Sequence, residues 1–587
     1  MEHWRTSWNE VAPARKDRSL NHPYDIYPSF PIGKGKILSG FECLADWMSQ
    51  YQKIRLDGYI GVLWNDFIGP LEAYFNKRGM RISWMAMDSA YKDEVELNTM
   101  LDPYIGTDDP LFGTRCDLDL DMFYKPGKPD DFIPDRDAQI SVVYGCGAGK
   151  VPWDGPLVYV DVPKNEIQFR SRAGSISNMG MKQPVSPKSM YKRFYFVDWP
   201  VLNQYKKKIL PDIDLMVDGQ RPENPLFIVG DDFRNALSEM AGNVFRVRPW
   251  FEPGPWGGQW IKRHIPALNQ DVENYAWSFE LIVPENGLLM ESDGYLLEIS
   301  FDFLMYQEYE RVLGRAASRF KDEFPIRFDF LDTMDGGNLS VQVHPREAYI
   351  QKEFGESFTQ DEAYYIIDAK DDARVNLGFQ SGVNPEAFRQ TLENSYKENI
   401  PVPIELYVQH HPSRKHDLFL IPNGTIHGSG EGNLVLEISS TPYIFTFKLY
   451  DWLRPDLDGR PRTLNIRRGF DNLDFNRQGD WVKKHLISRP EVISEKEGNI
   501  LVRLPTHPDH FYGVLRYEFD RDVSIETDNR CHVMMLVEGD RILLETRGGM
   551  QFIFNYAETF VVPAACESYI LKNSGSGRAK VVQAFVK

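Results

Sequence analysis

The stretch LSVQVHP, residues 339–345, alternates apolar and polar side chains. Successive side chains of a β-strand point to opposite faces, so its two valines would share one face and Gln342 and His344 the other. Such alternation is typical of an ordinary half-buried strand. Gln and His can also both ligate a metal ion, and here they stand two residues apart. The stretch therefore predicts a β-strand and leaves open whether its polar face is half of a metal site.

The length and composition of the chain are those of a globular protein with several hydrophobic cores. It has 587 residues, of which 42% are hydrophobic and 26% charged, and this length predicts two to four domains. The formal net charge is −18 at pH 7. Nucleic acids and anionic membranes repel an acidic chain of this kind, so we expect neither as a partner.

The five cysteines are widely spaced and form no CxxC pair. This pattern predicts reduced thiols and no cysteine-bound metal. No apolar run approaches the roughly 18 residues that cross a membrane, and the first residues lack the apolar core of a secretion signal. These features predict a cytoplasmic protein without a membrane anchor.

The first 238 residues have the order of strands and helices that is typical of an α/β domain with a parallel sheet. Strands are predicted at the short apolar runs. One helix is predicted where acidic residues begin a segment that ends near a glycine. The predicted strands are 55–64, 81–89, 212–219 and 225–230, and the predicted helices are 65–79 and 231–242.

From about residue 245 the chain changes to short runs of β-branched and aromatic residues between Gly, Pro, Asn and Asp. This pattern of short β-type runs between turn residues predicts all-β structure with helical insertions near 303–320 and 384–398. The segment from about 497 to 587 repeats this pattern of short β-type runs and resembles a second small β-barrel. We therefore divide the chain into an α/β domain (1–238), a β-barrel domain (239–490) and a C-terminal β domain (491–587).

The glycine-rich string VVYGCGAGKVPW (142–153) has some features of a phosphate-binding loop. A P-loop needs the pattern G-x-x-x-x-G-K-S/T. Here Gly145 and Gly149 are one residue too close, and Val151 replaces the hydroxyl residue that would hold Mg²⁺. The first strand–helix unit likewise carries NDFIGP, with one glycine and no lysine. We interpret the string as a glycine turn rather than a nucleotide site.

Two further polar strings have metal-ligand composition, although a solvent-exposed role is more common for each. DLDLD (117–121) has the carboxylates that Mg²⁺ prefers, but a solvated strand edge has the same composition. HHPSRKH (410–416) has adjacent imidazoles on a proline-containing loop, where histidines are usually surface residues. We assign no metal to either string.

Residues 340–440 differ because ligand-type residues recur on successive predicted strands. Imidazole nitrogens together with carboxylate and amide oxygens suit Zn²⁺ or another borderline cation. Three or four ligands leave a position open for water or substrate, as catalytic zinc requires. The alternative is that these are polar residues of the barrel core. The residues are Gln342, His344, Glu362 in EAYYII, His427 after a Pro-Asn-Gly turn, and Glu437 in NLVLEISS.

Four motifs in order resemble type I mannose-6-phosphate isomerases, which are zinc-dependent cupins. They are LSVQVHPREAY, DEAYYIIDA, IPNGTIHGSGEGNLVLEIS and FKLYDWLRPDLDGRPR, and PWFEPGPWGGQW (249–260) is similar to a Trp-Gly-Gly segment near the start of that family. The resemblance covers about residues 240–587. It implies two cupin-like barrels, one Zn²⁺ per chain, and Gln342, His344, Glu362 and His427 as its ligands. The N-terminal domain matches the family nowhere and faintly resembles a degenerate uridine-kinase-like P-loop domain.

The resemblance also implies roles for three further residues. Glu437 matches a family active-site carboxylate and is the candidate base. Lys448 is a candidate for binding phosphate or the developing oxyanion, and Arg454 is a second candidate for the anion. The chain departs from the family at two positions: Asp329 in FDFLDT stands where the family has lysine, and Lys448 where it has arginine. Lysine cannot make the planar two-point contact of arginine with phosphate.

The expected function is therefore a zinc-dependent aldose–ketose isomerase that interconverts mannose 6-phosphate and fructose 6-phosphate through an enediol. The two departures support an alternative, a non-catalytic metal-containing protein that binds sugar and has a regulatory role. A third interpretation, in which the N-terminal domain phosphorylates the sugar, is disfavoured by the missing P-loop. The sequence indicates neither the role of the N-terminal domain nor the oligomeric state.

Overall fold

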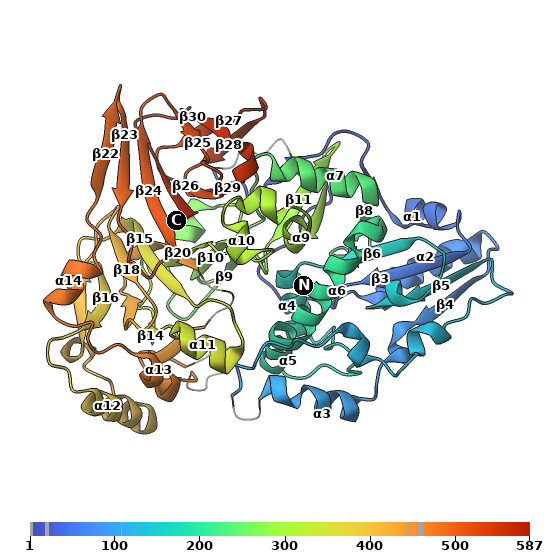
Figure 1. The fold of residues 1–587 in the computed structure, drawn as a ribbon, viewed down its shortest axis with the longest axis horizontal. Helices are drawn as coiled ribbons and strands as arrows, with labels where there is room; N and C mark the ends of the chain where they lie inside the picture. Colours follow the sequence, from blue (N-terminus) through green and yellow to red (C-terminus); the bar gives the residue numbers. More distant parts are fainter. Residues whose placement is uncertain (1–3, 18–22, 107–108, 441, 443–444, 456–461) are drawn as a thin grey trace. The chain divides into compact units, whose positions relative to one another are not determined.

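The structure is a computed structural model that describes residues 4–17, 23–106, 109–440, 442, 445–455 and 462–587 (Figure 1). The chain forms two compact units. The first comprises Met1–Leu20, Tyr27–Ala241 and Val283–Glu308, and the second comprises Asn21–Ile26, Gly242–Ile282 and Tyr309–Lys587. The division into three domains at 238 and 490 stays a prediction, whereas residues 283–308 pack with the first unit.

A seven-stranded sheet forms the centre of the first unit. Its order is β2-β8-β7-β6-β3-β5-β4, and the strands from β7 to β4 are parallel. β8 runs antiparallel to both of its neighbours, β7 and β2. The link between β7 and β8 is too short for the crossover that parallel strands need. The predicted parallel sheet is thus corrected to a mixed sheet. The strands are β2 (Ile37–Ser39), β3 (Lys53–Gly58), β4 (Ile82–Ala86), β5 (Ile140–Tyr144), β6 (Leu157–Asp161), β7 (Ile213–Asp218) and β8 (Leu226–Val229).

Helices accompany this sheet in the alternating order that the sequence predicted. Two of them correspond closely to the predicted helices 65–79 and 231–242. The helices are α1 (Phe41–Met48), α2 (Trp64–Lys77), α3 (Glu94–Ile105), α4 (Lys164–Ala173), α5 (Pro187–Arg193), α6 (Trp199–Ile209) and α7 (Gly230–Ala241).

Residues 283–308 add a hairpin to the first unit. β11 (Gly287–Ser292) pairs with β12 (Tyr295–Ser300), and β1 (Ser29–Pro31) pairs with β11. Two backbone N–H groups of β12 donate to buried carboxylates, Ser300 N to Asp161 Oδ2 at 2.7 Å and Glu298 N to Asp218 Oδ2 at 2.9 Å. Asp161 and Asp218 end β6 and β7. The hairpin therefore covers the carboxyl ends of these strands, where open α/β sheets usually bind ligands.

Two facing sheets form the first β-barrel of the second unit. Their orders are β18-β15-β20-β13-β10-β9 and β17-β16-β19-β14-β21. The strands are β9 (Trp250–Glu252), β10 (Trp277–Leu281), β13 (Arg327–Asp332), β14 (Val341–Val343), β15 (Asp361–Ala369), β16 (Arg374–Phe379), β17 (Val408–Pro412), β18 (Leu418–Ile421), β19 (His427–Ser429), β20 (Asn433–Ser440) and β21 (Phe447–Tyr450).

Helices are inserted between the strands of this barrel and before them. The insertions predicted near 303–320 and 384–398 are α9 with α10 and α12. The helices are α8 (Trp260–His264), α9 (Asp302–Leu313), α10 (Ala317–Phe320), α11 (Glu347–Phe354), α12 (Pro385–Glu398), α13 (Ile466–Asn472) and α14 (Asp480–His485). Asn384 begins α12 in the usual way, since its side chain accepts a hydrogen bond from Ala387 N.

A second pair of sheets follows, as the repeated pattern of short β-type runs predicted. Their orders are β22-β23-β24-β31-β26-β29 and β25-β30-β27-β28. Phe554 and Phe560 stack in the buried core, with ring centroids 4.0 Å apart. The strands are β22 (Glu491–Lys496), β23 (Asn499–Leu504), β24 (Tyr512–Phe519), β25 (Asp522–Glu526), β26 (His532–Glu538), β27 (Arg541–Thr546), β28 (Gln551–Asn555), β29 (Thr559–Val562), β30 (Ser568–Asn573) and β31 (Ala579–Val586).

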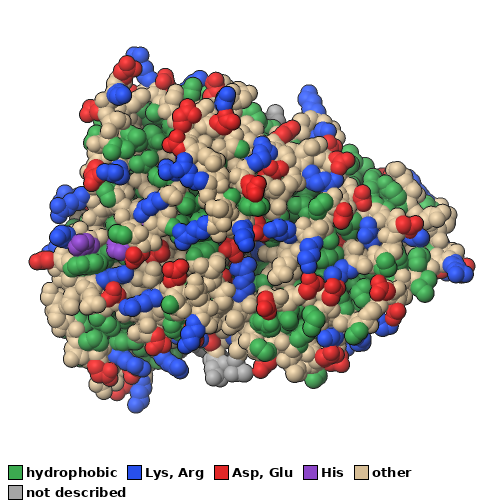
Figure 2. Space-filling view, in the orientation of Figure 1, with side chains coloured by type: hydrophobic (Ala, Val, Ile, Leu, Met, Phe, Trp, Pro, Cys, Tyr) green, Lys and Arg blue, Asp and Glu red, His purple; other side chains and the backbone are tan. Residues whose placement is uncertain are grey.

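The charges on one face of the surface and the state of the five cysteines can be compared with what the composition predicts. On the face shown in Figure 2, acidic and basic side chains are largely interspersed. This face therefore lacks the broad basic area that binds a phosphate backbone. The five cysteines are free thiols. Among the described residues, no helix is both long and apolar enough to cross a membrane.

Candidate metal centre

One row of the five-stranded sheet carries Gln342, His427 and Lys448. Gln342 in β14 is the register partner of His427 in β19 and of Lys448 in β21. Residues directly opposite each other in an antiparallel sheet point to the same face. His344 comes two residues after Gln342, and its ring centroid lies 4.9 Å from that of His427. The side chains of Gln342 and His344 thus reach the same site, as the alternation predicted.

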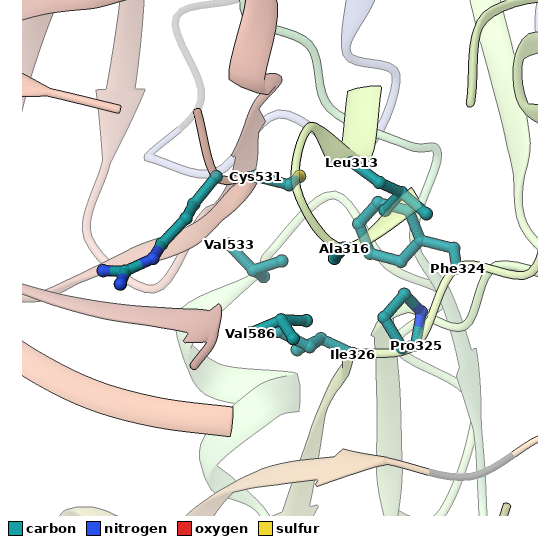
Figure 3. Close-up of a pocket in the computed structure, with 9 residues that line it drawn as sticks. Leu313, Ala316, Phe324, Pro325, Ile326, Cys531, Val533 and Val586 are labelled. Atoms are coloured by element: carbon teal, nitrogen blue, oxygen red, sulfur yellow. The ribbon is translucent and has the colours of Figure 1, made fainter. Parts of the chain in front are cut away.

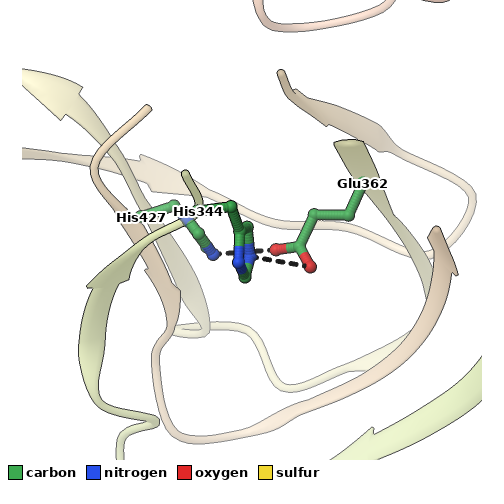
Figure 4. Close-up of side chains that lie close together, drawn as sticks. All are labelled: His344, Glu362 and His427. Atoms are coloured by element: carbon green, nitrogen blue, oxygen red, sulfur yellow. Dashed lines mark ion pairs between the residues drawn. The ribbon is translucent and has the colours of Figure 1, made fainter. Parts of the chain in front are cut away.

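Glu362 reaches the two histidines from β15, in the facing sheet. Its Oε1 lies 2.7 Å from His427 Nε2, and its Oε2 lies 3.1 Å from His344 Nε2 (Figure 4). All three side chains are buried. One ligand atom from each can be chosen so that all lie within 4.8 Å of one another. The structure therefore brings three of the four predicted ligands together from both sheets.

The other nitrogen of each imidazole is held by a backbone carbonyl. His344 Nδ1 lies 2.9 Å from Phe445 O, and His427 Nδ1 lies 2.9 Å from Thr425 O. Since a carbonyl oxygen can only accept, both Nδ1 atoms carry the proton. Each neutral ring then presents a lone pair on Nε2 to an oxygen of Glu362. That arrangement is favourable only when a proton or a metal ion lies between them.

Two buried atoms of this group have no hydrogen-bond partner within the described part of the chain. They are His344 Nε2 and Glu362 Oε1. Buried polar atoms in native proteins are nearly always paired, so unpaired ones need an explanation. A metal ion bound between the imidazoles and the carboxylate would satisfy both atoms.

Gln342 adjoins the group as the predicted fourth ligand. Its Nε2 lies 3.2 Å from His427 Nε2, and its Oε1 accepts a hydrogen bond from Ser340 Oγ at 3.0 Å. The oxygen and nitrogen of an amide have nearly the same shape, so a half-turn of the amide exchanges their positions. That rotation would present an oxygen, the ligand atom of glutamine, to the histidines.

A row of carboxyl groups lies beside the three ligands. Glu437 in β20 is the register partner of Asp329 in β13 and of Tyr364 in β15. Burial raises the pKa of Asp329 to about 8, opposed by Arg327 and assisted by Glu362. Burial, and then the charges of Asp329 and Glu362, raise the pKa of Glu437 well above its usual range. So many buried carboxyl groups are costly to ionise unless a cation compensates them.

The predicted anion-binding residues occupy β21 and the loop that follows it. Lys448 shares the row of Gln342, and so points to the side of the barrel that holds the ligands. Arg454 forms an ion pair with Asp451, in which its Nη2 donates to Asp451 Oδ1 at 2.5 Å. Arg462 Nη1 donates to the other oxygen of Asp451, also at 2.5 Å. Arg454 therefore belongs to a partly buried ion-pair network with Asp451 and Arg462.

The glycine-rich string of the first unit binds a carboxylate of the chain itself. The backbone N–H groups of Gly147 and Gly149 donate to the two oxygens of Asp57 at 2.9 and 2.7 Å, and Tyr205 Oη also donates to Asp57. Gly147 has a φ of 87°, and a Cβ there would lie 2.0 Å from Tyr124 Oη. The glycines thus permit a tight turn around a buried internal anion, which occupies these donors in place of a phosphate.

Side chains of the two other polar strings likewise contact other residues of the protein. Lys150 Nζ lies 2.7 Å from Asp121 Oδ1, and Lys208 Nζ lies 2.5 Å from Asp119 Oδ2. These residues of DLDLD are not in a strand, contrary to the strand edge considered above. In HHPSRKH, His410 contacts Asn376, and His416 contacts Tyr365 and Glu538. These lysine, tyrosine, amide and carboxylate contacts account for both strings without a ligand.

Tyr364 is a residue of the site that the sequence analysis did not select. Its ring lies 5.9 Å from that of His427 in an edge-on contact, between Glu362 and Glu437 on the inner face. Burial, then the charges of Glu362 and Glu437, raise the pKa of Tyr364 well above its usual range. The period of two along EAYYII could have identified it, because residues 362 and 364 share a face.

The donor set fits a divalent transition metal. Two imidazole nitrogens with fixed tautomers, one carboxylate and one neighbouring amide are the ligand types that zinc accepts, and both imidazoles have the outer hydrogen bond that usually accompanies metal-bound histidine. Fold and site together define a β-barrel protein with a buried His–Glu–His group suited to such a metal.

Comparison with known proteins gives one matching family and several relatives. A family described as "Domain of unknown function (DUF8485)" matches residues 40–242. The "Mannose-6-phosphate isomerase" of Streptococcus mutans is 24% identical over 315 residues, which are 54% of this chain and 90% of that protein. The "Probable mannose-6-phosphate isomerase GmuF" of Bacillus subtilis is 28% identical over 320 residues, 54% of this chain and 92% of that protein.

A solved structure is similar over a slightly larger share of the chain. The crystal structure of the mannose 6-phosphate isomerase of Bacillus subtilis covers 58% of this chain and 99% of its own, with 18% identity and a TM-score of 0.47. Relatives named mannose-6-phosphate isomerase thus match about half of this chain at low identity.

Proposed function

We propose that the protein is a zinc-dependent aldose–ketose isomerase that interconverts mannose 6-phosphate and fructose 6-phosphate. The observation that carries the proposal is the pair of imidazoles whose Nδ1 protons are fixed by carbonyls and whose Nε2 atoms converge on Glu362. The names of the relatives supply the substrate, and the metal centre supplies a means of polarising a sugar carbonyl.

The metal would be held by His344, Glu362 and His427, with Gln342 as the fourth ligand. Bound there, zinc supplies a Lewis acid that orients the open-chain sugar and stabilises negative charge on its oxygens. The carbonyls of Phe445 and Thr425 keep the two imidazoles in the ligating tautomer. The chain thereby preorganises the ligands before the ion arrives.

Glu437 is the residue we assign to proton transfer. Isomerisation removes a proton from the carbon beside the carbonyl and returns it to the neighbouring carbon. A carboxylate oxygen of Glu437 would accept that proton and release it again. General base catalysis of this kind contributes on the order of 10²–10⁴-fold to the rate. The assignment is supported by the register of Glu437 with Asp329 and Tyr364, on strands next to the one that carries the proposed ligand Glu362.

Lys448 is the residue we assign to the anionic part of the substrate. It lies in the row of Gln342 and His427 and carries a positive charge beside the ligands. Lysine binds phosphate as a point charge rather than through a planar fork. Arg454 is the second cation assigned to this role, and its contact with Asp451 fixes the position of its guanidinium.

The test is a comparison of Glu437→Gln with the unaltered chain in a coupled assay for fructose 6-phosphate. Glutamine keeps the shape of the side chain but cannot accept the proton, so kcat is expected to fall about 10²-fold or more. Zinc content is expected to stay unchanged, because Glu437 is not one of the ligands. Equal kcat values for the two chains would exclude Glu437 as the base.

A second candidate is a metal-containing sugar-binding protein without isomerase activity. Asp329 favours it, because the position opposite Glu437 has a carboxyl group where the resembled family has lysine, and so supplies no positive charge to a sugar phosphate. The same assay separates the two candidates. Zinc in the chain with no turnover of any hexose phosphate would favour the sugar-binding protein, whereas conversion of mannose 6-phosphate would exclude it.

A further inference from the structure

A groove of about 400 Å³ lies in the second unit, and its lining includes none of the residues assigned to the metal centre. It is formed by the link between α9 and α10, by the turn between β23 and β24, and by the end of β31. Arg315 comes from the first of these, Arg319 comes from α10 itself, and Asp509 and His510 come from the second. The full lining is Arg315, Ala316, Arg319, Pro508, Asp509, His510, Phe511, Val586 and Lys587.

The lining of the groove carries more positive than negative charge. Arg315, Arg319 and Lys587 are opposed by Asp509, which also faces Arg477 at 3.8 Å and His507 at 3.4 Å. Among the described residues, no carboxylate lies within ion-pair distance of Arg315 or Arg319. A cleft lined by one sign of charge concentrates ligands of the opposite sign.

Each arginine is held in place by a contact that leaves its charge uncompensated. The guanidinium of Arg315 donates to the backbone carbonyl of Asp528. The backbone N–H of Arg315 donates to Asn529 O at 2.9 Å. The guanidinium of Arg319 lies 4.9 Å from the ring centroids of both Phe320 and Phe511. Arginines fixed in this way lose less conformational entropy when they bind an anion.

His510 adds an unsatisfied polar group to the same lining. Its side chain is 1% exposed, and neither ring nitrogen has a hydrogen-bond partner in the described structure. The ring is held by stacking on Tyr512, with centroids 4.9 Å apart and planes 24° apart. Its turn is held by Lys587, whose Nζ donates to His510 O at 2.7 Å. A buried imidazole with two unused nitrogens on the wall of a groove is suited to contact a bound ligand.

An apolar recess adjoins the groove but does not enlarge it. It shares Ala316 and Val586 with the groove and is lined further by residues such as Phe324, Cys531 and Val533 (Figure 3). Its volume is about 10 Å³, which is no more than one water needs. A ligand would therefore occupy the cationic groove alone.

We propose that this groove is a second ligand site, which binds a small phosphomonoester through Arg315, Arg319 and His510. The guanidinium fork matches the oxygens of a phosphate dianion, and two arginines match its charge. The volume is within the range of small-molecule sites and exceeds what inorganic phosphate alone would fill. The inference rests on the groove itself and not on the proposed isomerase activity.

Calorimetric titration of the full chain carrying Lys448→Ala/Arg454→Ala, after treatment with a chelator, tests the groove without the metal ion and without the cations assigned to the isomerase site. The probes are inorganic phosphate, mannose 6-phosphate and unphosphorylated mannose. We expect the phosphorylated sugar to bind with one-to-one stoichiometry, and added salt to weaken it, while mannose does not bind. Binding of inorganic phosphate with equal affinity would identify phosphate alone as the ligand, and weaker binding would assign part of the affinity to the sugar. No binding of either up to about 10 mM would overturn the proposal.

The double variant Arg315→Ala/Arg319→Ala is expected to bind at least about tenfold more weakly, since each lost charge-assisted contact costs about this factor. His510→Phe keeps the stacking on Tyr512 and is expected to weaken binding about 2–10-fold. The matched control is Arg389→Ala/Arg503→Ala, which removes two arginines of the same unit that pair with Glu393 and Glu491 outside the groove. Unaltered affinity in the first double variant, with circular dichroism showing a folded chain, would also overturn the proposal.

Discussion

Removal of the metal is expected to lower the free energy of unfolding of the second unit. His344, Glu362 and His427 come from both sheets of the first barrel, so an ion bound to them links these sheets. An ion that binds only the folded chain stabilises it by RT ln(1 + [L]/Kd), which is about 2.7 kcal/mol when free zinc is 100 times Kd. Without the ion, the buried carboxylate of Glu362 loses its compensating charge, which adds to the cost.

The variant His427→Ala isolates this effect. It removes one ligand atom, and the affinity for zinc should fall by more than the roughly 10–100-fold that follows loss of a ligand's hydrogen-bonding partner. The assay is urea unfolding followed by tryptophan fluorescence, once with free zinc and once with EDTA. The unaltered chain should lose about 2–3 kcal/mol in EDTA, and His427→Ala close to nothing.

The matched control is His410→Ala, which removes a histidine that bonds to Asn376 instead of Glu362. It should keep the full response to EDTA. The comparison uses the EDTA-induced difference within each chain, because truncating a buried side chain also lowers the absolute stability. The reasoning would be refuted by an equal EDTA response in His427→Ala and in the unaltered chain, or by the absence of any response in the latter.

Three further predictions concern single side chains. Burial raises the pKa of Asp57 to about 6, so the folded chain keeps a proton that the unfolded chain releases near pH 4. The free energy of unfolding of the first unit should then fall by on the order of 3 kcal/mol as the pH rises from about 4 to about 6, and Asp57→Asn should flatten this slope in urea midpoints measured across that range. Lys448→Ala should raise KM for mannose 6-phosphate about tenfold with a smaller change in kcat, and an unchanged KM would remove Lys448 from the phosphate site. Burial raises the pKa of Asp329 to about 8, so its carboxyl group is charged only above that pH. Asp329→Asn should therefore tighten binding of the sugar phosphate roughly fivefold at about pH 9, an effect of about 1 kcal/mol, and little at about pH 6; weaker binding in a titration at the higher pH would contradict this.

The alternation of apolar and polar residues along single strands predicted much of the metal centre. Alternation in LSVQVHP predicted that Gln342 and His344 share a face, and the ligand types on later strands indicated Glu362 and His427. The structure brings these four side chains together. A strand's period of two fixes the face of a side chain, whatever the register of the neighbouring strands.

Sequence patterns were less informative where the answer depends on contacts between distant segments. The glycine string 142–153 was predicted to be a turn, but its partner Asp57 lies on another strand, and no local pattern names it. The hairpin at 283–308 was assigned to the barrel domain because its strands look like those of the barrel. Its N–H groups instead bind Asp161 and Asp218 of the first unit.

The register between strands was also not predictable from composition. Asp329 was noted as a departure from the family, but only the pairing of β13 with β20 places it opposite Glu437. The groove beside His510 depends on three segments that are far apart in the chain. Neither relation follows from a local period, because a register is set by packing and turns along the whole barrel.

Metal analysis combined with a coupled isomerase assay on the intact chain tests the central proposal most directly. The account predicts about one zinc per chain and conversion of mannose 6-phosphate to fructose 6-phosphate. It also predicts that activity is lost in EDTA and restored by zinc. Isomerisation at full rate by the metal-free chain would contradict it, and so would a zinc-loaded chain that turns over no hexose phosphate.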